Sequence, residues 1–307
     1  MRSVTPQSCA SLVLASILAL AVTGTARQDD PPAFKAGSSD LVVVPVTVTD
    51  KQGRLVSDLE RESFAVFDND RRQDIAFFTH EDTPVSVALV IDNSGSMRPK
   101  VGEVIAASLA FARASHPEDE LLVVEFNDDV RDALGGRRLS AADAGELETA
   151  LRSLRPEGQT ALYNALVDGL DHLEHATRAR RVMVLVSDGG DNASTTTFEE
   201  VLARARRSDV TIYTIGLFDE AARDTNPGVL KRLAEATGGR RFLPRSPGYL
   251  LQACQQIARE IRTSYTLGYV PTSRDGTYHR LRVTLGQKTN GSVRSRPGYF
   301  AGSAPPR

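Results

Sequence analysis

The sequence has little cysteine, and its charges nearly balance. Only two of the 307 residues are cysteine, Cys9 and Cys254. Lysine and arginine number 37 against 39 acidic residues, which gives a formal net charge of −2 at pH 7. Without a basic surplus, the composition gives no support for a nucleic-acid partner. The apolar content of 41% and charged content of 25% are ordinary for a soluble globular protein. The length suggests two domains, or one domain with additions.

Long apolar runs are also missing, except near the N-terminus. Arg2 supplies a positive start, an apolar run extends over 10–22, and the small residues of 24–26 follow. This is the architecture of a secretory signal, and the run is too short to span a bilayer comfortably. We predict a signal peptide over residues 1–26 with cleavage near Ala26. The protein is then secreted, or lies in the periplasm or cell envelope. We expect no transmembrane segment in the mature chain.

Removal of that segment leaves Cys254 as the one remaining cysteine. A single cysteine cannot form an internal disulfide. Cys254 shares a helical apolar stripe with Leu250, Ile257 and Ile261. The pattern favours a buried, inert thiol over a reactive one.

The chain has β-rich segments at both ends. Residues 27–39 are rich in Asp, Pro, Gly and Ser and are expected to form a flexible lead-in. Residues 40–82 begin with alternating valines at 42–48, which indicate a strand with one buried face, and Pro45 places that strand at an edge. Two further strands are predicted at 64–67 and 75–79.

The second β segment covers residues 263–301, and 302–307 form a tail. Strands are predicted at 265–270 and 280–285, with a short third made of 292–296 and 299–300. Hairpin turns are predicted at 273–276 and 289–291. Neither segment has enough strands to be stable alone. We therefore expect both segments to pair into one small β-sandwich.

Between them, residues 84–262 alternate strands with helices. The strands are unbroken apolar runs, which is typical of strands buried on both faces. The predicted strands are 85–91, 121–126, 181–187 and 210–217, and the predicted helices are 101–115, 144–154, 161–175, 198–207, 229–237 and 249–262. This order indicates an α/β fold: a doubly wound, mostly parallel sheet with helices on both faces.

Two of these strands end in acid. The first runs into Asp92-Asn93-Ser94-Gly95-Ser96, and the second into Asp188-Gly189-Gly190-Asp191. Open α/β sheets bind ligands outside the carboxyl ends of their strands. A third hydroxyl, Thr160, directly precedes the helix that begins at Ala161. Hard oxygen groups gathered at one edge indicate a Mg²⁺-type site and not a thiolate or imidazole one.

This set of residues resembles the von Willebrand factor type A domain with its metal-ion-dependent adhesion site. The family pattern is Asp-x-Ser-x-Ser, then a Thr in a later loop, then an Asp after a later strand. It is matched in order by Asp92, Ser94, Ser96, Thr160 and Asp188. The resemblance covers about residues 84–262. The flanking segments are similar to bacterial VWFA-related domain proteins, at 46–50 and 296–299.

The resemblance implies a binding function. Ser94 and Ser96 would bind Mg²⁺ or Mn²⁺ directly, and Asp92 and Asp188 largely through water. Thr160 would bind directly or through water, depending on the state. The open coordination position would take an Asp or Glu carboxylate from a partner protein. Four neighbouring residues, Asn93, Gly95, Asp191 and Asn192, are expected to shape the loops or to support the ligands.

Two other classes stay open. A metal-assisted hydrolase would need a nucleophile and a base, but Ser94 is not in a Gly-x-Ser-x-Gly motif. No histidine is expected near the site: His116, His172 and His175 should lie distally, and His80 and His279 belong to the β segments. We therefore expect no enzyme activity. The second alternative is an envelope structural or assembly protein that uses the domain as a scaffold. Taken singly, Ser96 and Thr160 would be ordinary turn or cap residues.

Overall fold

A computed structural model describes residues 41–218, 226–286 and 291–302. The predicted signal peptide and lead-in lie outside these residues, as does the tail after Gly302. Within the described ranges, no helix is both long enough and apolar enough to cross a membrane.

The central sheet follows the predicted α/β pattern. Its strands lie in the order β11-β10-β9-β5-β6-β7, with β8 also paired to β6. The pairings are parallel, except that β7 and β8 run antiparallel to β6. The strands are β5 (Ser86–Asp92), β6 (Glu120–Phe126), β7 (Val130–Asp132), β8 (Leu139–Ser140), β9 (Arg181–Ser187), β10 (Thr211–Gly216) and β11 (Arg241–Phe242).

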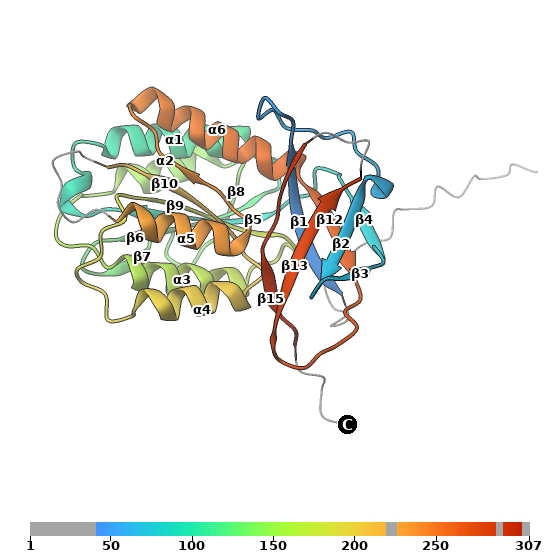
Figure 1. The fold of residues 1–307 in the computed structure, drawn as a ribbon. Helices are drawn as coiled ribbons and strands as arrows, with labels where there is room; N and C mark the ends of the chain where they lie inside the picture. The colour runs from blue at the N-terminus through green and yellow to red at the C-terminus, as the bar shows by residue number, and fades with distance from the viewer. Residues whose placement is uncertain (1–40, 219–225, 287–290, 303–307) are drawn as a thin grey trace, which may run out of the picture. The chain divides into compact units, whose positions relative to one another are not determined.

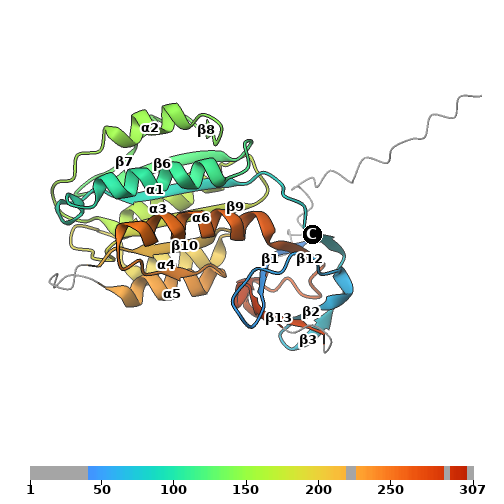
Figure 2. The same cartoon turned by 90° about the horizontal axis from the view of Figure 1, so that it is seen from above.

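Helices cover both faces of this sheet, as Figure 1 shows. They are α1 (Val101–Ala114), α2 (Ala144–Arg152), α3 (Leu162–Glu174), α4 (Phe198–Arg207), α5 (Pro227–Thr237) and α6 (Pro247–Thr263). Side chains alternate along β5: Val87 and Leu89 join the apolar cluster of α1 and α6, whereas Ala88 and Val90 join that of α3, α4 and α5. Both faces of β5 are therefore apolar because both are covered. Figure 2 shows α1 and α6 side by side over one face.

The two β segments pair with each other, as expected. One four-stranded antiparallel sheet has the order β14-β1-β12-β4, and the other has the order β15-β13-β2-β3. Each contains strands from both segments, and they share an apolar core that includes Val46, Val66 and Leu281. The strands are β1 (Val42–Thr49), β2 (Phe64–Asp68), β3 (Arg71–Gln73), β4 (Phe77–Thr79), β12 (Tyr265–Tyr269), β13 (Tyr278–Leu285), β14 (Ser292–Arg294) and β15 (Gly298–Phe300). Short 3-10 turns stand at η1 (Arg61–Ser63) and η2 (Gly95–Met97).

The expectation that Pro45 lies on an edge strand is wrong. Strand β1 lies between β12 and β14. However, β14 pairs only with Thr47–Thr49, whereas Pro45 lies opposite Thr266 of β12. Among the described strands, none pairs with the other side of Pro45. An inner strand can therefore contain a residue that has no N–H to donate.

The hairpin predicted at 273–276 is also wrong, and the pairing predicted across 289–291, of which 289 and 290 lie outside the described residues, is not formed. Strands β12 and β13 belong to different sheets, and β14 pairs with β1 instead of β13. The predicted third strand is in fact two strands, β14 and β15, one in each sheet. Pro297 stands between them and cannot donate to a ladder, which favours the break. The connections therefore cross between the sheets instead of folding back within one.

Polar contacts join the sandwich to the α/β part of the chain. Only Ser264 separates α6 from β12. Glu260 of α6 is fully buried and forms ion pairs with Arg294 of β14 and with Arg240. Arg296 donates from Nη2 to the carbonyl oxygen of Arg206 at 2.9 Å. The sandwich therefore lies against the α/β part through buried charge and backbone contacts.

Candidate metal centre

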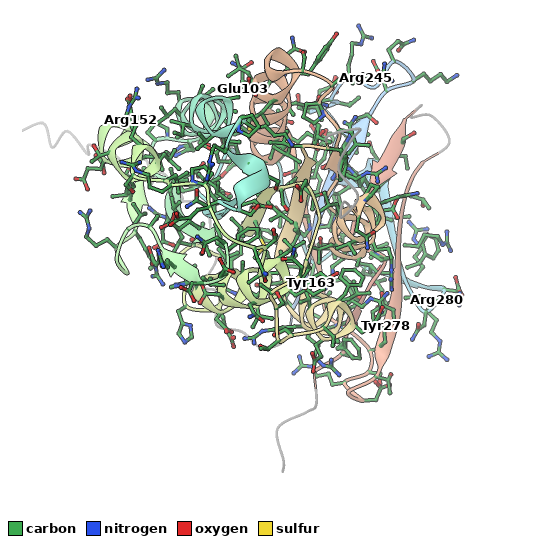
Figure 3. All side chains as sticks on the ribbon, turned by 90° about the vertical axis from the view of Figure 1, so that its left-hand side faces the viewer. Glu103, Arg152, Tyr163, Arg245, Tyr278 and Arg280 are labelled. Atoms are coloured by element: carbon green, nitrogen blue, oxygen red, sulfur yellow. The ribbon has the colours of Figure 1, made fainter. Side chains whose placement is uncertain are left out.

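The two acid-tipped strands are neighbours in the sheet. Asp92 is the last residue of β5, and Asp188 directly follows β9, which pairs with β5 in parallel. The chain after β5 passes to α1 on one face, and the chain after β9 passes to α4 on the other. The strand order reverses at this point, which is where open α/β sheets bind their ligands. Figure 3 looks onto this edge of the sheet.

Hydrogen bonds connect four of the five predicted ligands. The amide of Ser94 donates to Oδ1 of Asp92 at 3.0 Å, and the hydroxyls of Ser94 and Ser96 lie 3.1 Å apart. Ser96 Oγ donates to Oδ2 of Asp188 at 2.9 Å. Asp92, Ser94 and Asp188 are buried, whereas Ser96 is exposed. The cluster therefore reaches the surface at Ser96.

Thr160, the fifth predicted ligand, lies in a loop that contacts the loop of Asp92. The amide of Glu157 donates to the carbonyl of Asn93 at 3.0 Å, and the amide of Gly95 donates to that of Gly158 at 3.2 Å. Gly158 has φ +72°, and a Cβ there would lie 1.8 Å from the Asp128 carboxylate. The positive φ and this close approach favour glycine at the turn. Thr160 itself is buried, with 7% of its surface exposed.

The four neighbouring residues shape these loops. Asn192 accepts from the amide of Thr160 at 2.8 Å, and Asn93 donates from Nδ2 to Glu125 at 2.9 Å. Gly95 contributes the backbone contact to Gly158. Asp191 accepts from the amide of Tyr163 at 3.1 Å. Asp191 thus accepts a hydrogen bond from a backbone amide in the first turn of α3, as a helix-capping residue does.

Two further hydroxyls, which the sequence pattern did not predict, hold these loops. Ser187 Oγ donates to Oδ2 of Asp92 at 2.7 Å and accepts from the amide of Gly189 at 3.0 Å. Ser194 Oγ donates to Asp191 at 2.5 Å and accepts from the amide of Tyr163 at 3.0 Å. A polar residue at the end of a buried apolar strand was a signal for Ser187. Its hydrogen-bond partner, Asp92, could not be predicted without knowing which strands are neighbours in the sheet.

The electrostatics of the site favour a cation. Burial raises the pKa of Asp92 to about 6, and the Asp188 charge adds to this rise, while hydrogen bonds from Ser94 and Ser187 oppose it. In the described ranges, no ion pair joins a lysine or arginine to either carboxylate. The nearby Lys100 Nζ instead donates to the carbonyl of Leu217 at 2.6 Å. A divalent ion would therefore supply the positive charge that no lysine or arginine supplies to these two carboxylates.

The donor chemistry fits magnesium or manganese. Among the described residues, no group of three or more His, Cys, Asp or Glu side chains could hold a metal. An ion at this edge would therefore depend on the hydroxyls as well as on the two carboxylates. Such an all-oxygen set suits Mg²⁺ or Mn²⁺ and differs from the thiolate and imidazole set of a zinc site.

Comparison with known proteins supports the assignment of this fold to one protein family. A doubly wound sheet with these loops at its carboxyl edge is the architecture of a von Willebrand factor type A domain. The sequence matches that family, the von Willebrand factor type A domain, over residues 86–255. Because the match spans more than half of the chain, the protein belongs to this family. No curated protein sequence matches the chain.

Solved structures are similar to this chain at low sequence identity. A von Willebrand factor type A protein from Catenulispora acidiphila is 15% identical, with a TM-score of 0.53, over 85% of this chain and 73% of that one. The pilus adhesin SpaC from Lactobacillus rhamnosus GG is 12% identical, with a TM-score of 0.49, over 78% and 48%. The von Willebrand domain of the pili tip protein Mfa5 from Porphyromonas gingivalis is 15% identical, with a TM-score of 0.47, over 59% and 95%. At such identities the likeness concerns the fold alone.

Proposed function

We propose that this protein is an exported, non-enzymatic binding protein that captures an acidic side chain of a partner protein through a divalent ion. The proposed ligands are Asp92, Ser94, Ser96, Thr160 and Asp188, and the ion is Mg²⁺ or Mn²⁺. The observation that carries the proposal is the hydroxyl of Ser96, an exposed residue, which contacts both Ser94 and Asp188. It joins the two acid-tipped strands where the site opens to solvent. Export rests on the signal peptide predicted over residues 1–26.

The chain's own groups would orient the ligands. The amides of Ser94 and Gly190 each donate to one carboxylate, at 3.0 and 3.1 Å, and fix where its oxygens point. Ser187 holds the remaining oxygen of Asp92. When bound, the ion would supply positive charge that can accept one more oxygen ligand, such as a partner's carboxylate. Binding of this kind needs no proton transfer and no bond cleavage.

A hydrolase is the first alternative, and the positions of the histidines argue against it. The amide of His116 donates to Asp119, whose other oxygen accepts from the amide of Val85. His116 therefore lies at the amino end of β5, whereas the site lies at its carboxyl end. His172 and His175 lie at the end of α3, also away from its start beside Thr160. An envelope scaffold protein is the second alternative, and it would require no metal.

Calorimetric titration with Mg²⁺ and with Mn²⁺ tests the site. Asp92→Asn and Asp92→Ala should each abolish binding of both ions, and the far-ultraviolet circular dichroism should stay native. Asp129→Asn is the matched control, because it removes one exposed carboxylate, 71% exposed, that holds none of the proposed ligands. Metal affinity that is equal in the original and Asp92 variants would refute the assignment.

A pull-down from the native envelope or medium tests the shared-ion mechanism. The partner should be retained with Mg²⁺ present and released by EDTA. Retention that persists in EDTA would reject the mechanism, even if calorimetry shows an ion at the site. An esterase or phosphatase activity that requires Ser94 would instead favour the hydrolase.

A further inference from the structure

The outer face of the second sandwich sheet carries arginine and aromatic side chains. From Tyr278 to Val283 of β13, exposed and buried residues alternate. The buried set, which faces the sandwich core, is His279, Leu281 and Val283. The exposed set is Tyr278, Arg280 and Arg282. Because side chains two apart in a strand lie on the same face, these three point away from the core. Figure 3 shows Tyr278 and Arg280 at one side of the molecule.

The strand register extends this face across the sheet. Arg282 lies opposite Phe67 of β2, and Phe67 lies opposite Arg72 of β3. At the other edge, Tyr278 lies opposite Phe300 of β15. Directly opposed residues of an antiparallel pair share a face. We name the set Arg72, Arg280, Arg282, Phe67, Tyr278 and Phe300 the arginine face.

Ring contacts hold part of this face in place. The guanidinium of Arg282 lies 4.2 Å from the ring centre of Phe67. Arg207 of α4 lies 4.4 Å from the ring centre of Phe300 and adds a fourth positive charge at the edge. Cations over aromatic faces are attracted by the ring quadrupole. The arginines are therefore partly ordered, yet the side chains of Arg280 and Arg282 remain 74% and 53% exposed.

The charge on this face is positive, although the whole chain is slightly acidic. Its strands contribute three outward arginines and no outward carboxylate. Asp70, in the turn between β2 and β3, pairs with Arg280 at 2.7 Å and reaches Arg282 at 3.7 Å. Asp74 follows β3 at the sheet edge. With Arg207 included, the face and its edge carry four arginines and two carboxylates, those of Asp70 and Asp74.

We propose that the arginine face binds the anionic phospholipid headgroups of a membrane surface. Strands lie about 4.8 Å apart, so Arg72 and Arg282 are about 10 Å apart across the sheet. Arg280 and Arg282 are about 7 Å apart along β13. The charges thus form a two-dimensional array on a sheet surface, which matches a planar layer of phosphates. A linear acidic polymer would instead follow a single row or a groove.

The side-chain chemistry agrees with this partner. Guanidinium groups form paired hydrogen bonds with phosphate oxygens. Tyr278, 37% exposed, combines an apolar ring with a polar hydroxyl, as is typical of residues at a membrane interface. Each arginine near an anionic surface is worth about a fivefold change in affinity, so binding by this face alone is weak and reversible. The face lies in the sandwich, so this inference does not rest on the proposed metal site.

Vesicle co-sedimentation of the purified protein tests the proposal. The protein should bind vesicles of phosphatidylcholine mixed with phosphatidylglycerol, and it should bind vesicles of pure phosphatidylcholine far less. High salt should release it because exposed charges are screened. The double variant Arg280→Gln, Arg282→Gln should lose about 25-fold in affinity for the mixed vesicles. Arg280→Lys with Arg282→Lys should keep most of the binding.

The matched control is Arg131→Gln with Arg137→Gln. These arginines are 62% and 65% exposed, and each pairs with one carboxylate, so the control makes the same change in charge on the α/β part of the chain. It should bind mixed vesicles like the original protein, as should Asp92→Asn. Equal binding to neutral vesicles, or equal losses in the control and the arginine-face variant, would overturn the proposal. So would release by inorganic phosphate at matched ionic strength, or binding to dextran sulfate without binding to vesicles.

Discussion

Ser187 Oγ donates a 2.7 Å hydrogen bond to Oδ2 of Asp92 where β9 and β5 end side by side. Both side chains are buried, and the same hydroxyl accepts from the amide of Gly189. The other oxygen of Asp92 accepts from the amide of Ser94. Ser187 therefore connects the first proposed ligand to the loop that follows Asp188.

Ser187→Ala should weaken divalent-ion binding without removing any proposed ligand. Loss of a group that orients a metal ligand typically lowers metal affinity by about 10- to 100-fold. The hydrogen bond from Ser187 lowers the pKa of Asp92, so its loss also makes protons compete better with the ion. Titration calorimetry with Mg²⁺ measures the change. An affinity equal to that of the original chain would show that Ser187 does not orient Asp92.

The buried Glu260 should stabilise the contact between the α/β part and the sandwich. Its side chain is 1% exposed and pairs with Arg294 on one oxygen and with Arg240 on the other. Glu260→Gln leaves Arg294 without its carboxylate, which should cost about 3–5 kcal/mol in free energy of unfolding. Arg240→Gln on the same carboxylate should cost less than about 1 kcal/mol, because Arg240 is 45% exposed. Urea denaturation measures both, and equal losses would contradict this assignment.

Tyr269 should lock the two sandwich sheets together. It lies in β12 of the first sheet, and its hydroxyl donates at 3.0 Å to Asp68, in β2 of the second. Tyr299 donates to the same carboxylate oxygen at 2.7 Å, and His279 lies 2.8 Å from the other oxygen. Tyr269→Phe removes one hydrogen bond to a buried carboxylate, which should cost about 1.5–3 kcal/mol of stability.

The exposed Tyr278 provides the control for that substitution. Tyr278→Phe should change the free energy of unfolding by no more than about 0.5 kcal/mol. Thermal and urea unfolding of the two variants give the comparison. If both variants are as stable as the original chain, the hydroxyl of Tyr269 does not hold the sheets together.

The sequence predicted those features of the fold that depend on local pattern. The four buried strands appear as apolar runs, and β9 occupies the predicted residues 181–187. The cap of α4 is equally local, because Thr197 and Glu200 stand three residues apart in the sequence and form a capping box in the structure. Short strands such as β8 and β11, two residues each, have no period to detect and were missed.

The local sequence pattern could not predict which strands pair with one another over long sequence separations. The turn residues at 273–276 and 289–291 resemble hairpin turns, yet the flanking strands lie in different sheets. Strand partners are chosen by packing of the shared core, which no turn encodes. The same limit applied at the candidate site. Its five proposed ligands follow from a pattern, whereas the bond between Ser187 and Asp92 depends on which strands are neighbours.

Cys254 should be unreactive in the folded protein. It is buried, as the sequence predicted, and burial raises the pKa of its thiol to about 12. The thiolate is the nucleophile, so the neutral thiol should not react with Ellman's reagent at pH 8. Guanidinium should expose it and give one equivalent of reaction in a Cys9→Ser chain.

Burial of the neutral Cys254 thiol also makes the free energy of unfolding depend on pH. The pKa of the thiol is higher in the folded chain than its unfolded value near 9, so its contribution to stability is fully present below pH 9 and is lost as the pH rises toward 12. Rapid reaction of the native chain at pH 8, or stability unchanged up to pH 11, would contradict this burial.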